Sequence, residues 1–249
     1  MPEHQFIFIG GLHRSGTTLL GRLLAEHPQI SGFRDTGATE DEGQHLQSVY
    51  PAAQEFGGPG RFGFNSNSFL DERSPLVSPE NAEKLFRQWS PYWDLQKPFL
   101  LEKSPPNLVR TRFLQALFPN SRFIIVMRHP IAVSYATKKW SHTRIHSLIE
   151  HWLVCYERFE SDRPYLNRVL VLRYENLIAD PGGTLDRIYE FLGLETAAIA
   201  SDKIRQGVND RYFNWWGDRR NPIKFIYTGY IINRFESRVN HFGYSLRDV

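Results

Sequence analysis

The sequence predicts one α/β domain spanning residues 1–249, with a central parallel sheet of four or five strands between two layers of helices, as in P-loop-like folds. Two observations carry this prediction. Short apolar runs alternate with segments whose apolar residues recur at helical spacing, a pattern typical of parallel sheets covered on both faces. A glycine-bearing loop also separates the first apolar run from the first helical segment, as in proteins that bind phosphate groups.

Each predicted element has its own signal. The first strand is Phe6–Ile9, and the helix after it ends at His27-Pro28 because proline disfavours the helical conformation in the residue before it. A second helix is entered through Pro105-Pro106, a long one begins near Ile145, and another ends at Gly193. Three further apolar runs predict strands: Phe99–Leu101, Phe123–Met127 and Val169–Leu172.

Composition narrows the class of protein without naming a function. Thirty basic and 27 acidic residues give a net charge of +3, and their scattered placement argues against a nucleic-acid-binding surface. Cys155 is the only cysteine and lies in an apolar helical pattern, so we expect a packed thiol and no intrachain disulfide. The sequence shows neither a membrane-span pattern nor a signal-peptide pattern, and we expect a cytoplasmic protein.

Residues 51–75 form a segment of unusual composition. It is rich in glycine and in small polar residues, yet it keeps four phenylalanines. Long loops of this kind are often lids over functional sites, so we expect a lid on the acceptor side of a ligand. The alternative is an insertion that folds onto a small core of its own.

The loop Gly11–Thr18 indicates which ligand the chain holds. It keeps both glycines and the final hydroxyl residue of the phosphate-binding pattern G-x-x-x-x-G-K-[ST], but Thr17 stands where that pattern has lysine. The lysine meets the dense charge of a nucleoside triphosphate with magnesium. A sulfonate esterified to a phosphate carries less charge and needs no metal, so the loop is predicted to hold a phosphosulfate, with no metal site.

Two cations follow predicted strands. Arg128 ends the run Phe123–Met127 and precedes Pro130, which suits the start of a helix. An arginine at the carboxyl end of a parallel strand is placed to hold a second phosphate by forked hydrogen bonds. Lys103 follows another strand at the same sheet edge. The alternatives are a surface salt bridge for Arg128 and an exposed loop cation for Lys103.

Four segments, in order, resemble the sulfotransferases that use 3′-phosphoadenosine-5′-phosphosulfate (PAPS), especially tyrosylprotein sulfotransferases and their bacterial relatives. The resemblance covers most of the chain. It implies the α/β fold described above, transfer of a sulfonate group, and PAPS as donor with adenosine 3′,5′-bisphosphate (PAP) as product. The segments are Arg14–Thr18, Lys103–Pro105, Leu117–Pro130 and Val171–Leu177.

The resemblance also implies a set of nucleotide-binding residues. Arg128 would bind the 3′-phosphate, and Tyr174 would lie near the nucleotide. The serine that the family commonly places eight residues after this arginine is Ala136 here, so Ser134 is the expected substitute. If Ser134 points away, backbone amides at the helix start serve instead. The 5′-phosphosulfate would be held by Arg14, Ser15, Gly16, Thr17 and Thr18.

The carboxyl-terminal region contributes one more candidate. Family members often close a loop over the nucleotide, and Arg211 in the run Val208–Trp216 would then reach the phosphates. The aromatic residues around Arg211 are also typical of core packing.

The implied reaction is an in-line displacement at sulfur. Lys103 and Arg14 would stabilise the charge that develops on the leaving oxygen. A carboxylate after the first helix would be the general base. Glu42 is favoured because it precedes a helical segment and reaches further, whereas Asp35 matches the family by its distance from His27-Pro28.

The acceptor is expected to be a small molecule, glycan or peptide that carries a hydroxyl or an amine. Two other functions share the phosphate loop: a P-loop small-molecule kinase, which would need magnesium, and an inactive nucleotide-binding protein, which would bind without turnover.

Overall fold

The computed structural model describes residues 4–197, 204–218 and 220–249. Within these residues a single sheet contains five strands, all parallel, in the order β2-β3-β1-β4-β5. This confirms the predicted α/β fold with a parallel sheet. The strands are β1 Gln5–Gly11, β2 Ile30–Gly32, β3 Phe99–Lys103, β4 Ser121–Met127 and β5 Val169–Arg173.

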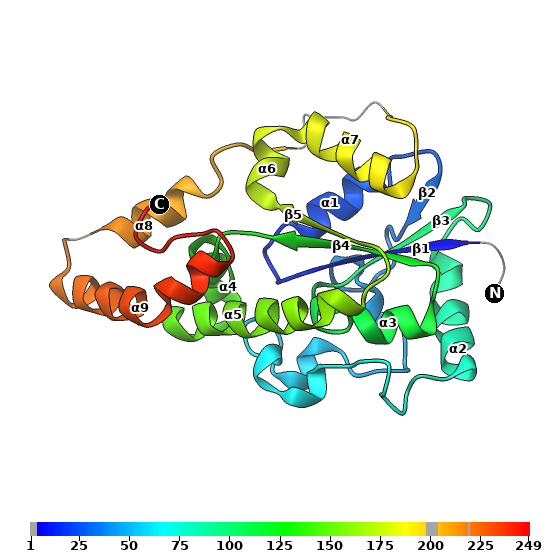
Figure 1. Ribbon diagram of the computed structural model, residues 1–249, viewed down its shortest axis with the longest axis horizontal. Helices are drawn as coiled ribbons and strands as arrows, with labels where there is room; N and C mark the ends of the chain where they lie inside the picture. The colour runs from blue at the N-terminus through cyan, green and yellow to red at the C-terminus, as the bar shows by residue number, and fades with distance from the viewer. Residues whose placement is uncertain (1–3, 198–203, 219) are drawn as a thin grey trace.

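Helices cover both faces of the sheet (Figure 1). They begin in ways that the sequence explains, since α2, α4, α7 and α9 each have proline in the first turn. The helices are α1 Thr17–Leu24, α2 Pro79–Trp89, α3 Thr111–Leu117, α4 Pro130–Ser141, α5 Ile145–Asp162, α6 Tyr174–Ala179, α7 Pro181–Leu192, α8 Asp210–Gly217 and α9 Pro222–His241.

The two faces of the sheet carry separate parts of the core. Side chains alternate along each strand, so that Ile7 of β1 packs with α1, α6 and α7 on one face. Phe8, its neighbour in the chain, belongs to the opposite core with α2 and α3. The ring of Phe8 stacks on Phe123 of β4 at 5.7 Å between centroids. This arrangement fixes β1 and β4 side by side, which matters for the loops that follow them.

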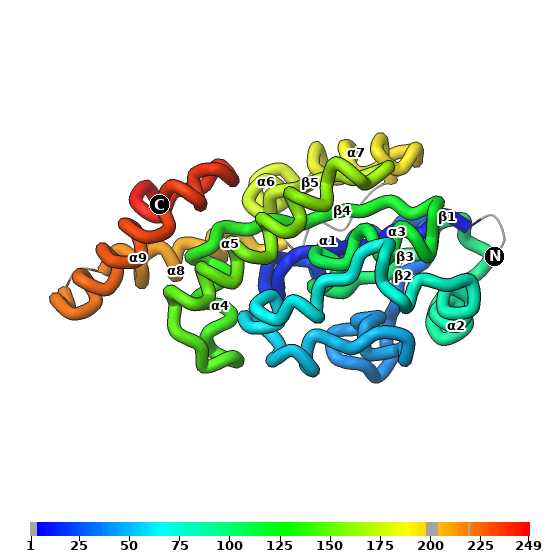
Figure 2. Tube along the Cα trace, turned by 60° about the horizontal axis from the view of Figure 1, so that its bottom comes forward, coloured from blue at the N-terminus to red at the C-terminus, as the bar shows by residue number. Residues whose placement is uncertain are grey.

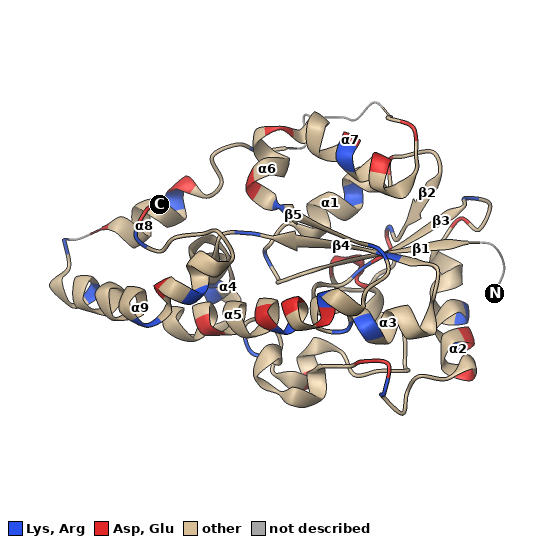
Figure 3. Ribbon diagram, viewed as in Figure 1, with Lys and Arg blue, Asp and Glu red and all other residues tan. Residues whose placement is uncertain are grey.

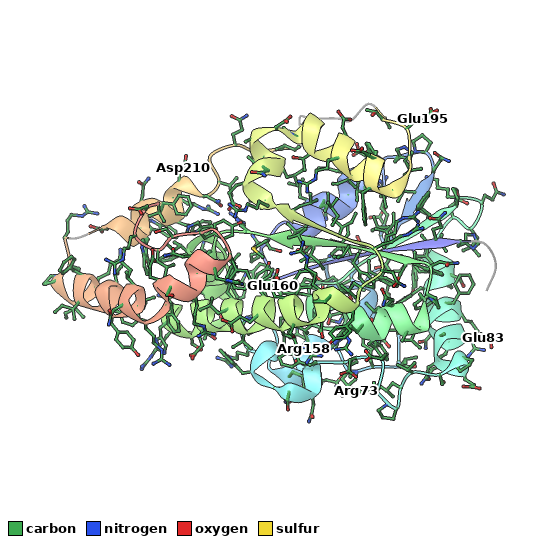
Figure 4. All side chains as sticks on the ribbon, viewed as in Figure 1. Arg73, Glu83, Arg158, Glu160, Glu195 and Asp210 are labelled. Carbon is green, nitrogen blue, oxygen red and sulfur yellow. The ribbon has the colours of Figure 1, made fainter. Side chains whose placement is uncertain are left out.

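The segment 51–75 packs against α5. It contains three short 3-10 helices, and Phe62 is fully buried, with its ring 4.8 Å from the ring of His151. The Arg158 guanidinium lies 3.8 Å from Asp71 and so ties the end of the segment to α5 (Figure 4). The segment has its own packed contacts, as the alternative of a folded insertion predicts, and part of it also reaches the pocket described below.

Five elements lie outside those that the sequence predicted: β2, α2, α6, α8 and α9. Strand β2 has three residues, too few for a period to be read. Helix α9 is apolar on more than one side, because Phe225 and Tyr227 are two residues apart and so lie on nearly opposite sides. Its sequence therefore does not mark which side packs.

None of the helices among the described residues is both long enough and apolar enough to cross a lipid bilayer.

One carboxylate is buried inside the sheet. Glu102 of β3 is 0% exposed and accepts hydrogen bonds from the backbone N of Gly43 at 2.9 Å, from Ser104 Oγ at 2.5 Å and from Asn107 Nδ2 at 2.5 Å. A Cβ on Gly43 would lie 2.5 Å from Glu102 Cγ, so this approach requires glycine. Glu102 therefore fastens the turn that follows residue 42 to strand β3.

Burial raises the pKa of Glu102 to about 7, against the hydrogen bonds that favour its charged form. The native state therefore favours the protonated carboxyl relative to the unfolded chain. As the pH rises from 4.5 to about 7, we expect the free energy of unfolding of the wild type to fall by about 3 kcal/mol more than that of Glu102→Gln.

Urea unfolding of the two proteins across this pH range measures the difference. Glu83→Gln on the exposed surface of α2 is the control and should keep the wild-type pH dependence. Parallel curves for wild type and Glu102→Gln would contradict the expectation.

Candidate functional site

A pocket of about 960 Å³ opens at the carboxyl edge of the sheet. It is bounded by the loop after β1, by the segment between β2 and α2, by the end of α4 and by Tyr174 at the start of α6. Open α/β sheets bind ligands at this edge. Part of the segment 51–75 also lines the pocket, through Gln54, Gly57, Pro59 and Arg61. Its role as a lid remains a prediction.

The phosphate loop turns tightly between β1 and α1. The backbone N of Ser15 donates to the carbonyl of Leu12 at 3.0 Å, and Arg14 and Gly16 have φ of 71° and 103°. The positive φ of Gly16 favours glycine, and a Cβ there would lie 2.4 Å from Tyr174 Cδ2. The Tyr174 ring therefore packs directly on the loop. The amides at the start of α1 face a site suited to an anion.

The predicted loop residues divide between pocket and core. Arg14, Gly16, Thr17 and Thr18 line the pocket. Ser15 is fully buried, and its Oγ would lie 2.6 Å from a Cβ on Gly11. The Ser15 side chain thus lies beneath the loop, so any contact of this residue with a ligand would be through its backbone amide.

Arg128 lies beside the phosphate loop. Its Nη1 donates to the carbonyl of Arg14 at 2.7 Å, and its Nε and Nη2 both donate to Asn209 Oδ1, at 2.9 and 2.6 Å. The guanidinium stands 4.3 Å from the centroid of the Tyr174 ring. Burial lowers the pKa of Arg128. Within the described ranges no carboxylate forms a salt bridge with it, although the charge of Glu175 acts on it from a greater distance.

Lys103 and Glu42 form a buried pair at the edge of the pocket, whose lining includes Glu42 but not Lys103. Lys103 Nζ lies 3.4 Å from Glu42 Oε1 and donates to the carbonyl of Glu40 at 2.7 Å. Gln44 Nε2 donates to Glu42 Oε2 at 2.6 Å. Burial raises the pKa of Glu42, although the charge of Lys103 opposes this. Glu42 lines the pocket, where a carboxylate with a raised pKa suits a general base.

The structure separates Asp35 from this group. Asp35 lies in an exposed turn, with φ of 54°, and does not line the pocket. Glu42, in contrast, precedes Gly43, which is fixed by Glu102. The geometry therefore favours Glu42 over Asp35 as the carboxylate that meets a ligand.

Ser134 lies away from the pocket. It is 0% exposed on α4 and lines a separate internal cavity of about 10 Å³ together with His13 and His151. The first turn of α4 packs into the core at this point, so the side chain has no path to the large pocket. The geometry gives no support to Ser134 as a phosphate ligand and leaves the backbone amides of the helix start as the alternative.

Arg211 is exposed on α8 and does not line the pocket either. Its Nη2 donates to Tyr212 Oη at 2.6 Å, and the guanidinium lies 4.5 Å from the centroid of that ring. The Tyr212 ring lies 5.9 Å from the Arg128 guanidinium. Contact between Arg211 and a nucleotide would therefore require movement of α8 and remains a prediction.

Two residues in or beside this site, Asn209 and Trp140, were not predicted from the sequence. Asn209 holds two donors of Arg128 and itself donates to Glu175 Oε1 at 2.9 Å. Trp140 at the end of α4 lines the pocket and lies 4.5 Å from the Arg14 guanidinium. Asn209 lies in the run Val208–Trp216 but meets Arg128 only through the fold, and Trp140 reaches the pocket from the end of α4. No local signal in the sequence could have identified these contacts.

The chain is similar to known proteins in both sequence and fold. The model of the sulfotransferase family matches residues 6–198. Omega-hydroxy-beta-dihydromenaquinone-9 sulfotransferase Stf3 of Mycobacterium tuberculosis (strain CDC 1551 / Oshkosh) is 28% identical over 154 residues, which are 54% of this chain and 40% of the relative. Protein-tyrosine sulfotransferase 2 of Gallus gallus is 26% identical over 208 residues, 77% of this chain and 52% of the relative. The chain thus spans about half or less of the length of these curated relatives.

Solved structures show the same fold. The sulfotransferase domain of the Synechococcus PCC 7002 olefin synthase has a TM-score of 0.56 and 19% identity, with 98% of each chain covered. A sulfotransferase from Alicyclobacillus acidocaldarius has a TM-score of 0.51 and 16% identity, with 96% of this chain and 97% of the other covered. Because the family model matches most of the sequence, this chain belongs to the sulfotransferase family, a family of PAPS-dependent enzymes.

Proposed function

We propose that this chain transfers a sulfonate group from PAPS to a hydroxyl or amine acceptor by in-line displacement. The observation that carries the proposal is the shared pocket in which the lysine-free phosphate loop, Arg128 and Glu42 meet. Two relatives are named for acceptors that bear a hydroxyl, a hydroxylated menaquinone and protein tyrosine. They support a hydroxyl as acceptor without choosing a molecule.

The residues of the pocket fit the donor. The loop comes so close to Tyr174 that Gly16 has no room for a side chain, which leaves the backbone amides to approach a phosphosulfate. Arg128 offers forked donors whose present partners are a neutral amide and a carbonyl. A phosphate oxygen would satisfy the same donors with a stronger, charge-assisted bond. In this proposal the loop holds the 5′ end and Arg128 the 3′-phosphate.

The reaction breaks one bond to sulfur and forms another. PAPS, when bound, supplies the sulfonate and a bisphosphate leaving group. Glu42 takes the proton of the acceptor as the acceptor oxygen or nitrogen bonds to sulfur. Lys103 and Arg14 stabilise the negative charge left on the phosphate oxygen that departs. Lys103 now contacts Glu42 and the Glu40 carbonyl, so it can couple the charge of the base to that of the leaving group.

The first prediction concerns the ligand. PAP should bind in calorimetry with a metal chelator present, and ATP with magnesium should not displace it. A screen of acceptors with labelled donor and mass spectrometry should then detect an added sulfonate. Magnesium-dependent ATP binding without PAP binding would establish the kinase alternative, and PAP binding without turnover on any acceptor would establish an inactive nucleotide-binding protein.

The second prediction tests which of two arginines, Arg128 or Arg211, contributes to PAP binding. Arg128→Ala should weaken PAP binding roughly 10- to 100-fold, because it removes a charge-assisted contact with a phosphate. Its effect on turnover at saturating donor should be smaller, since this phosphate is remote from the sulfur. Arg211→Ala is the comparison and should leave PAP affinity unchanged if α8 stays as the structure has it. Unchanged affinity in Arg128→Ala would remove Arg128 from the site.

The third prediction identifies the base. Glu42→Gln should lower kcat about 100-fold or more while PAP affinity is preserved. Burial raises the pKa of Glu42. As the pH is lowered, wild-type activity should therefore begin to fall at a pH above the ordinary pKa of glutamate. The residual activity of Glu42→Gln should not show this fall. Asp35→Asn is the matched control. A loss of turnover in Asp35→Asn instead would assign the role to Asp35.

A further inference from the structure

One end of the molecule exposes large apolar side chains. Helices α8 and α9 project beyond the rest of the chain there, beside the end of α4 (Figure 2). The second half of α9 is well buried, with Ile231 and Val239 at 0% exposure, whereas several large apolar side chains in its first half are exposed. We call the exposed set the apolar end: Trp140 53%, Trp215 44%, Ile223 78%, Phe225 54%, Ile226 71% and Tyr230 52%.

Cations surround the apolar end. The stretches 138–144 and 215–230 contain six lysines and arginines and one acid, Asp218. The chain as a whole has a net charge of +3, and these two stretches contribute +5, so the remainder is net negative. Lys138, Lys139 and Arg144 are exposed at the end of α4 and just after it. Figure 3 shows the lysines and arginines of α4 and α9 in blue.

The apolar end is held in place by the fold. His146 Nδ1 lies 2.9 Å from Tyr227 Oη, which joins α9 to the start of α5. Lys139 Nζ lies 6.0 Å from the centroid of the Trp215 ring, which places a cation of α4 beside an aromatic ring of α8. Lys138 and Arg144 also line a surface hollow together with Tyr227 of α9. Basic groups at the end of α4 therefore lie beside α8 and the first half of α9.

We propose that the apolar end docks onto a lipid surface that contains anionic lipids. Aromatic and aliphatic side chains rimmed by lysine and arginine are the composition of segments that lie in the membrane interface. The cations complement anionic headgroups, and the isoleucines and aromatic rings enter the boundary with the acyl chains. Trp140 belongs both to this surface and to the lining of the 960 Å³ pocket, so docking brings the mouth of the pocket close to the lipid.

Two other occupants, a second copy of the chain and a nucleic acid, match this surface less well. In a symmetric dimer the same patch meets itself, and the cations of one copy would face those of the other. A nucleic acid would satisfy the cations, but it offers no apolar partner for Ile223 and Ile226, which are the two most exposed side chains of the patch. A lipid surface satisfies both kinds of group.

Vesicle flotation of the full chain tests the docking. We expect the chain to float with vesicles of phosphatidylcholine mixed with phosphatidylglycerol and to bind vesicles of phosphatidylcholine alone much more weakly. Added salt should reduce binding because it screens the cations. Ile226→Asp should lower vesicle affinity roughly tenfold or more, and Lys138→Glu with Lys139→Glu should lower it by at least about fivefold for each charge removed.

The matched control is Leu95→Asp, which alters an exposed apolar side chain, 43% exposed, in the turn between α2 and β3; it should bind as wild type does. Circular dichroism and thermal melting verify that each variant is folded, and light scattering gives its mass. Equal binding to both kinds of vesicle, no binding to either, or unchanged binding of Ile226→Asp would overturn the proposal. The proposal would also be overturned if the wild-type protein did not float but formed a dimer that Ile226→Asp dissociates.

Discussion

The hydrogen bond from Arg128 Nη1 to the carbonyl of Arg14 joins the end of β4 to the loop after β1. Parallel pairing of β1 with β4 makes this contact available, because neighbouring parallel strands end at the same edge of the sheet. The contact sets the distance between the phosphate loop and a second basic group. It also keeps Arg128 beside the Tyr174 ring, which itself packs on Gly16. The loop, the arginine and the ring therefore form one rigid wall of the pocket.

A buried guanidinium with neutral partners is costly without a ligand. Removal of a charge from water is compensated only when opposite charges or several hydrogen bonds replace the water. Arg128 has three hydrogen bonds and an aromatic face, but its salt-bridge position is open among the described residues. A dianionic phosphate at that position would supply the missing charge. If Arg128 binds a phosphate as proposed, the folded protein holds this side chain ready for the anion at some expense in stability.

A second group of buried charged side chains surrounds Glu42. Three ionisable side chains, Glu42, Lys103 and Glu102, lie close together in β3 and in the turn that contacts it. Lys103 can neutralise one carboxylate, and burial raises the pKa of both glutamates. Glu102 holds the backbone after Glu42, and Glu42 faces the pocket. Glu102 thus helps to position Glu42, the proposed general base, by fixing the backbone of the next residue.

Local sequence determined the strands β1, β3, β4 and β5 and the phosphate loop, because apolar runs, glycine and proline act through nearest neighbours in the chain. It also placed Arg128 and Lys103 at strand ends, where parallel topology brings them to one edge. It favoured Glu42 over Asp35 only by position and reach, since both lie in one irregular stretch, and it could not show that the contact of Gly43 with Glu102 holds the turn at Glu42. Nor could it show that Ser134 faces an internal cavity. Asn209, Trp140 and the exposed apolar end depend on how α4, α8 and α9 meet. Such long-range packing leaves no periodic mark in the chain, and only the tertiary structure decides it.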